Sequence, residues 1–163
     1  ITPGIAQRMT AGTGILHSER NDVWRHDPAI ARHDDPAHVV QMWIVPDTAG
    51  VAPGYAEADV TAALATGELV PIVSGLPHHR GSAVLTLQNR FAGFSVARLP
   101  AAGAVHLPDS AYLHVFVARG SVSLEGTPLG QGDAARLTAD GGLRIQAAED
   151  SEILVWEMTR ELI

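Results

Sequence analysis

The chain has 163 residues, 11 basic and 18 acidic side chains, a formal net charge of −7 and no cysteine. Its scattered basic residues disfavour a nucleic-acid-binding protein, because such affinity needs clustered Lys and Arg. The absence of cysteine excludes disulfides, thiolate nucleophiles and zinc–thiolate sites. No apolar run approaches the roughly 20 residues of a membrane span, and we expect a cytoplasmic protein of one domain or two small ones.

The first predicted elements are two strands, at residues 5–9 and 14–18. They flank a bend at residues 11–14, where Gly12 and Gly14 permit backbone angles that a side chain would forbid. Residues 19–38 are rich in charged side chains and proline, which predicts a long polar loop.

Residues 39–45 form a nearly continuous apolar run that ends at Pro46, and this pattern predicts a buried strand. A loop rich in Pro and Gly is expected at residues 47–55. The composition of residues 56–67 fits a short helix, but its poor apolar period leaves helix and coil equally compatible with it.

The C-terminal half consists of short apolar runs separated by glycine turns at about ten-residue spacing. This pattern predicts an all-β sandwich or barrel rather than an α/β fold. The predicted strands are 69–73, 83–87, 91–99, 111–118, 122–124, 134–137, 143–147 and 153–156.

One histidine and one glutamate stand two residues apart, directly after the glycine bend. If that segment is an extended strand, His17 and Glu19 project to the same side, about 7 Å apart along the chain. An imidazole and a carboxylate that converge in this way can share a divalent cation. The alternative is a polar pair at the mouth of a barrel with no metal.

The remaining histidines are interpreted as structural or solvated. His78 and His79 are adjacent, so they would point to opposite sides of a strand, and they follow Pro77 in a predicted loop. His106 and His114 lack a preceding His-x-His pair, and we read both as structural. Three more are expected to be solvated in the polar loop: His26, His33 and His38.

The segment Met9-Thr10-Ala11-Gly12-x-Gly14-Ile15-x-His17-Ser18-Glu19, preceded by Thr2-Pro3-Gly4, resembles the pirin family. The likeness continues through Gln41-Met42-Trp43-Ile44-Val45-Pro46 and Pro53-Gly54-Tyr55. The resemblance implies an all-β, cupin (jelly-roll β-barrel) architecture. In it, residues 1–70 are the C-terminal part of an N-terminal cupin plus a linker, and residues 71–163 are a complete C-terminal cupin domain.

Pirins hold iron with three histidines and one glutamate of the N-terminal cupin. The resemblance therefore implies that His17 and Glu19 are ligands of Fe(II), with Glu19 also acting as a catalytic base. The other two histidines belong to a His-x-His pair, which this sequence lacks. Since the chain begins with Ile1 rather than Met, we expect that part of the first cupin precedes it and that the iron site is incomplete here.

The function implied by the resemblance is that of a non-haem Fe(II)-dependent dioxygenase acting on a flavonol-like, quercetin-type substrate. Alternatives are a regulatory binding module without enzymatic activity, with or without metal, and a purely structural module. An incomplete cupin would also expose unpaired strand edges. We therefore expect self-association through residues 1–55, disorder there, or a cleaved N-terminal fragment bound to them.

Overall fold

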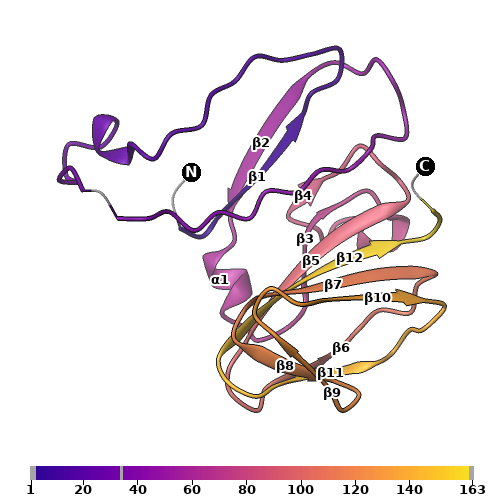
Figure 1. The fold of residues 1–163 in the computed structure, drawn as a ribbon. Helices are drawn as coiled ribbons and strands as arrows, with labels where there is room; N and C mark the ends of the chain where they lie inside the picture. The colour runs from indigo at the N-terminus through magenta and orange to yellow at the C-terminus, as the bar shows by residue number, and fades with distance from the viewer. Residues whose placement is uncertain (1–2, 34, 162–163) are drawn as a thin grey trace.

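The computed structural model describes residues 3–33 and 35–161, and Figure 1 shows their arrangement. Thr2 of the N-terminal motif, its neighbour Ile1, and Asp34 of the polar loop lie outside the described residues. The described chain is built almost entirely of strands and loops, and its one α-helix, α1 (Thr61–Leu64), has four residues. The expected all-β class is confirmed.

The C-terminal part is a sandwich of two sheets. The larger sheet has the order β10-β7-β12-β5-β3-β4 and the smaller one the order β6-β11-β8-β9. Within the two sheets every strand pair is antiparallel except β3–β4. The larger sheet contains β3 (Val70–Ser74), β4 (Leu85–Thr86), β5 (Ala92–Leu99), β7 (Tyr112–Arg119), β10 (Ala134–Thr138) and β12 (Ser151–Met158), and the smaller contains β6 (Ala104–His106), β8 (Ser121–Leu124), β9 (Thr127–Gly130) and β11 (Arg144–Ala147).

The main core lies between these two sheets. On β12 every second side chain points inward, and Ile153 and Val155 are 0% and 1% exposed. They pack in one cluster with Val122 and Ile145 of the smaller sheet. Burying each such side chain stabilises the fold by about 1.5–3 kcal/mol. This two-layer arrangement is the cupin architecture expected for the C-terminal half.

The outer face of the larger sheet is covered by the N-terminal part of the chain. Leu64 of α1 packs there with Phe94 and Leu154, and alanines of two further strands lie against the same cluster. Those strands, β1 (Ile5–Thr10) and β2 (Gly54–Asp59), form an antiparallel ribbon in which Ile5 lies opposite Asp59. In Figure 1 the ribbon stands beside the β3–β4 edge, and the loop of residues 11–53 extends away from it.

Two strand predictions for the N-terminal part are wrong. None of the described residues between 11 and 53 is in a strand; they include one short 3₁₀ helix, η1 (Val23–Arg25). Residues 14–18 are irregular, and the apolar run 39–45 is largely exposed, with Trp43 at 86% and Val39 at 63%. An apolar run forms a stable strand only beside a partner strand, and the described residues provide none here.

The segment 56–67, whose composition leaves a short helix and coil both open, contains the end of a strand and a single helical turn. Residues 54–59 alternate between half-buried and exposed, as expected for β2 paired with β1, and only residues 61–64 are helical. Among the described residues no helix is both long and apolar enough to cross a lipid bilayer.

Candidate functional site

The predicted ligand pair lies in the irregular segment that follows the glycine bend. At Gly12 the backbone has φ +55°, and a Cβ would come within 2.2 Å of the carbonyl oxygen of Val51, so only glycine fits. His17 and Glu19 follow in an exposed stretch. Glu19 Oε1 accepts a hydrogen bond from Gln41 Nε2 at 3.2 Å, which connects the two sides of the long loop.

The inference that His17 and Glu19 share a face depended on an extended strand, which the structure does not contain at that point. In the part of the chain that the structure describes, no third His, Asp or Glu completes a ligand group with them. Imidazole nitrogen and carboxylate oxygen suit Fe(II) chemically, but two protein ligands fill only a minority of an octahedral shell. Their role as ligands therefore stays a prediction.

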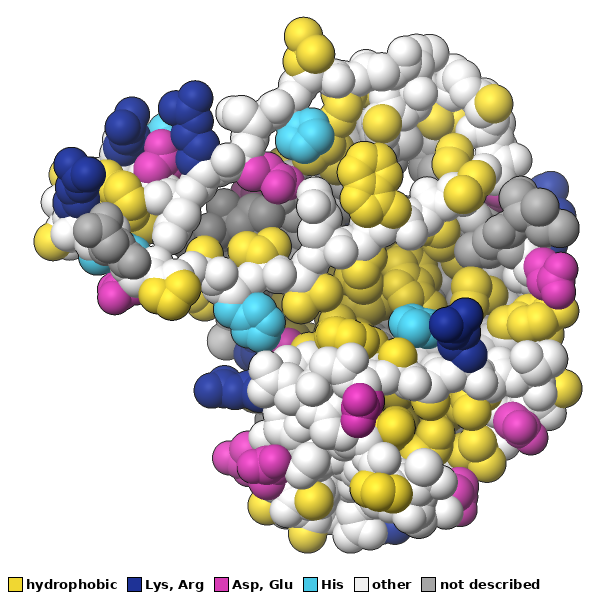
Figure 2. Space-filling view, viewed as in Figure 1, with side chains coloured by type: hydrophobic (Ala, Val, Ile, Leu, Met, Phe, Trp, Pro, Cys, Tyr) yellow, Lys and Arg dark blue, Asp and Glu magenta, His cyan; other side chains and the backbone are white. Residues whose placement is uncertain are grey.

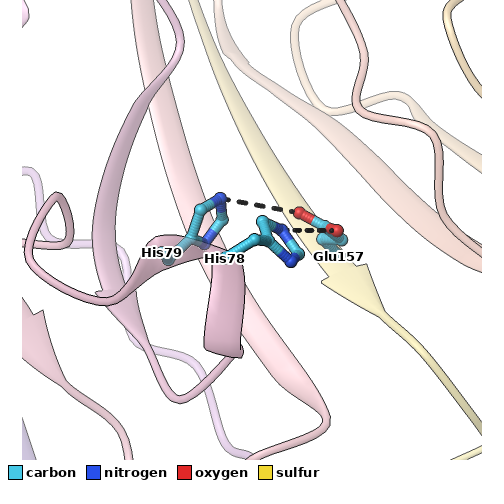
Figure 3. Close-up of side chains that lie close together, drawn as sticks. All are labelled: His78, His79 and Glu157. Carbon is cyan, nitrogen blue, oxygen red and sulfur yellow. Dashed lines mark ion pairs between the residues drawn. The ribbon is translucent and has the colours of Figure 1, made fainter.

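A different cluster brings two histidines and a glutamate together in the C-terminal cupin (Figure 3). His78 Nε2 lies 3.1 Å from Glu157 Oε1, and His79 Nε2 lies 3.8 Å from Glu157 Oε2. The candidate ligand atoms of the three residues all lie within 4.8 Å of one another. This is the arrangement of two imidazoles and a carboxylate that transition metals use in proteins.

The turn geometry explains why adjacent histidines meet the same carboxylate. His78 and His79 end a 3₁₀ helix, η2 (Pro77–His79), which begins with a proline whose fixed φ suits that position. With about three residues per turn, neighbouring side chains diverge by about 120° rather than by the 180° of a strand. The expectation that the two rings point to opposite sides is therefore wrong, and their centroids are 4.4 Å apart.

Glu157 reaches the cluster from the inward face of β12. It continues the alternation of Ile153 and Val155 and lies opposite Gly93 of β5. Its residue exposure is 3%, and its Oε2 atom has no hydrogen-bond partner among the described atoms. A buried carboxylate oxygen without a partner is costly, because nothing replaces the water it has lost.

The ring of His79 is fixed from its other side. Its Nδ1 lies 3.0 Å from Ser74 Oγ, which also accepts a hydrogen bond from the Leu76 backbone N–H at 3.1 Å. Burial lowers the pKa of His79 below its ordinary value, and the nearby Glu157 carboxylate opposes part of that shift. A neutral His79 imidazole offers one nitrogen lone pair for a ligand.

A sequence signal for this cluster exists, but it is weak. The sequence pattern predicts a last strand that ends at Trp156, which leaves out Glu157, the next inward position after Ile153 and Val155. An acidic residue at a core position of a strand is unusual and indicates a buried partner. Nothing local to the sequence, however, shows that this partner is the turn at residues 77–79.

The other histidines do not join a ligand group of three among the described residues. His106 is exposed on β6, whereas His114 on β7 is partly buried opposite Arg136. His33 lies 3.2 Å from Asp35 within the long loop. The partial burial of His114 agrees with the structural role expected for it, whereas His106, also expected to be structural, is exposed. His26 and His38 are exposed in the long loop, as expected for solvated residues.

An open pocket of about 290 Å³ borders the cluster and is lined by His79, Ser74 and Asn89 among other residues. Two hydrogen bonds connect the long loop to the rim of this pocket. Asn89 Nδ2 donates to the carbonyl of Val45 at 2.8 Å, and the Arg90 backbone N–H donates to Asp47 Oδ2 at 3.0 Å.

Two family models match the chain, one in its N-terminal part and one in its C-terminal part. Residues 1–44 match the model described as pirin, and residues 83–158 match the model described as the quercetinase C-terminal cupin domain. The chain is 44% identical over 163 residues to a Mycobacterium tuberculosis protein named "Putative quercetin 2,3-dioxygenase", covering 99% of this chain and 62% of the relative. It is 25% identical over 159 residues to the Escherichia coli K12 protein named quercetin 2,3-dioxygenase, covering 97% and 62%.

Solved structures agree on the fold. YhhW from Escherichia coli superposes with a TM-score of 0.63 at 20% identity, over 74% of this chain and 50% of that one. A structure of bacterial pirin YhhW in complex with nickel(II) gives a TM-score of 0.62 at 20% identity, over 73% and 49%. The chain thus spans about three-fifths of the length of its curated relatives and about half of these solved chains.

Proposed function

This chain belongs to the pirin family, and we propose that the protein containing it is an Fe(II)-dependent dioxygenase of flavonol-type substrates. The observation that supports the proposal is the pirin match of residues 1–44, because this segment carries His17 and Glu19. The resemblance assigns that imidazole and that carboxylate to the metal. The name of the mycobacterial relative, which shares 44% of its aligned residues with this chain, supports the same substrate class.

Fe(II) held by imidazoles and a carboxylate supplies open coordination positions for an oxygen-rich substrate and for O2. In the proposal His17 provides an imidazole nitrogen and Glu19 a carboxylate oxygen. Gln41 donates its hydrogen bond to Oε1 of Glu19, which leaves Oε2 free for the ion. The remaining ligands have to come from residues outside those described, from substrate or from water.

A second role proposed for Glu19 is that of a base. A flavonol binds best as its enolate, and a carboxylate beside the metal can take the hydroxyl proton. Both His17 and Glu19 are exposed, so substrate and solvent reach them without rearrangement of the described chain. Gln41 would act as a positioning residue by holding the carboxylate of Glu19.

The test is oxygen consumption by the full-length protein after anaerobic loading with Fe(II). We expect quercetin-dependent O2 uptake together with loss of the flavonol absorbance. His17→Ala and Glu19→Gln should remove the uptake and lower the iron content, whereas His106→Ala, a change at an exposed histidine of β6, should keep both.

A folded, iron-loaded protein that consumes no O2 with any flavonol tested would contradict the dioxygenase proposal. If that protein still binds the flavonol, the regulatory binding module becomes the better description. Gln41→Ala offers a finer test, since a positioning role predicts lower kcat with intact iron content.

A further inference from the structure

We propose that His78, His79 and Glu157 form a second metal site, in the C-terminal cupin, for a divalent transition metal such as Zn²⁺. The site is independent of His17 and Glu19 and does not rest on the proposed dioxygenase function. It joins the turn η2 to the central strand β12, as Figure 3 shows.

The distances fit a shared ion. Zinc lies about 2.0–2.2 Å from imidazole nitrogen and carboxylate oxygen, so two ligands of a tetrahedral site are about 3.4 Å apart. The two observed nitrogen–oxygen separations, 3.1 Å for His78 and 3.8 Å for His79, lie on either side of that value. The second is too long for a hydrogen bond but suits two atoms that face one ion.

The negative charge of the buried Glu157 side chain would be stabilised by a cation bound beside it. Its side chain is 4% exposed, and among the described residues its ion pairs are with His78 and His79 and with no Lys or Arg. Oε2 has no hydrogen-bond partner, although it is buried and directed at His79. A divalent ion would satisfy this oxygen and compensate the buried charge, which two imidazoles do only when they are protonated.

Outer contacts also favour metal binding. When Nδ1–H of His79 donates to Ser74 Oγ, the Nε2 atom presents its lone pair toward Glu157. Such a hydrogen bond to the far nitrogen is the usual support of a metal-bound histidine. Gly93, opposite Glu157, leaves room for this ring, since a Cβ there would lie 3.0 Å from His79 Nδ1.

The cluster is accessible to an ion. The side chain of His78 is 54% exposed, whereas that of His79 is 14% exposed. The pocket of about 290 Å³ beside His79 gives solvent a second approach. Three protein ligands leave at least one position of a tetrahedral ion for water or another small ligand, which is the pattern of reactive rather than purely structural zinc sites.

The proposal is tested on the full-length protein carrying His17→Ala and Glu19→Gln, so that the first pair contributes nothing. Apo protein is titrated with Zn²⁺ in a calorimeter and with Co²⁺ in a visible spectrometer. We expect one equivalent of Zn²⁺ and ligand-field bands from Co²⁺. Adding His78→Ala or Glu157→Gln should weaken Zn²⁺ binding by about 100-fold, because loss of even an outer-shell partner costs about 10–100-fold.

His106→Ala is the matched control, and it should leave the Zn²⁺ affinity unchanged. Because His78 is half exposed, its replacement tests the site even if Glu157→Gln fails to fold, which a thermal melt reports. Ser74→Ala should weaken Zn²⁺ binding by about 10-fold without changing its stoichiometry. Failure of the background protein to bind Zn²⁺, or binding that His78→Ala leaves intact, overturns the proposal.

Discussion

Gly93 shows how a missing side chain shapes the second cluster. A Cβ at this position would lie 2.7 Å from Ser74 Oγ, 2.9 Å from Leu76 Cδ1 and 3.0 Å from His79 Nδ1. All three neighbours are buried or partly buried, so they have little freedom to move. The glycine therefore sets the position of the His79 ring relative to Glu157.

We predict that Gly93→Ala lowers the free energy of unfolding by about 1–3 kcal/mol, as overpacking of a core does. It should also weaken Zn²⁺ binding at His79. Denaturant unfolding and Zn²⁺ titration measure the two effects. Gly130→Ala is the control, because its nearest contact would be an ordinary 3.7 Å to Asp133. Equal stability and equal affinity of Gly93→Ala and the unsubstituted chain would contradict this account.

His114 makes the stability depend on pH. Burial is the main cause that lowers its pKa below 6.5, and the facing Arg136 adds repulsion. Its register partner on the other side, Trp156 of β12, carries no charge. The unfolded chain therefore takes up a proton at this residue before the folded chain does as the pH falls.

Proton linkage gives the direction in which His114 makes the stability change with pH. Well above pH 6.5 both states are neutral at His114 and the residue has no effect. As the pH falls through 6.5 the unfolded state binds more protons than the folded state, and the stability falls. We predict that His114→Gln removes part of this loss as the pH is lowered through 6.5. Denaturant unfolding at several pH values measures it, and parallel curves for the two proteins would rule the effect out.

Eight of the ten strands of the two C-terminal sheets could be predicted from the sequence, because their pattern is local, whereas the short strands β6 and β9 were not predicted. On β12, Ile153 and Val155 alternate with outward residues, and the turn at Gly120 has φ +73°. Each such signal is contained in a few residues.

The strand predicted at residues 5–9 is confirmed as β1 (Ile5–Thr10), but the rest of the N-terminal part and the second cluster could not be predicted in this way. The apolar run 39–45 has the composition of a strand, but whether it becomes one depends on a partner elsewhere in the chain. Similarly, the meeting of His79 with Glu157 depends on sheet register and on a 3₁₀ turn, which leave no motif in the sequence.

Asn89 connects the long loop to the C-terminal sandwich. It is 2% exposed, its Nδ2 donates to the carbonyl of Val45, and its Oδ1 accepts from the Phe91 backbone N–H at 2.9 Å. We predict that Asn89→Ala lowers stability by about 1–3 kcal/mol and increases protease cleavage within residues 39–47. Limited proteolysis measures the second effect. Gln88→Ala, a change at an exposed neighbouring position, is the control, and the protease should cleave it at the rate of the unsubstituted chain. If Asn89→Ala is also cleaved at that rate, this contact does not hold the loop.

At the scale of the whole molecule, exposed apolar surface is concentrated in the N-terminal third. All the large exposed hydrophobic residues in the described chain except Val84 lie within residues 1–55, with Leu16 at 102% and Trp43 at 86%. Figure 2 shows apolar side chains at the surface of the extended loop as well as over the sandwich. Such surface commonly marks a contact with another chain.

The expected self-association through residues 1–55 accordingly stays a prediction. We expect the 163-residue chain to form dimers or larger species in sedimentation velocity, and Leu16→Ser with Trp43→Ser to shift it toward monomer. Val84→Ser, at the exposed apolar residue outside this region, is the control. A cleaved N-terminal fragment bound to the chain would be detected by intact mass. A clean monomer without such a fragment, in which residues 1–55 are fully ordered and solvent-exposed, would contradict the expectation.

The central claim is that this pirin-family protein carries two separate metal sites, one at His17 and Glu19 and one at His78, His79 and Glu157. Metal content per full-length chain, measured for the unsubstituted protein, Glu19→Gln and Glu157→Gln after loading and desalting, tests it most directly. The account predicts that each substitution removes metal from its own site while the other remains loaded. Equal metal content in all three folded proteins would contradict it.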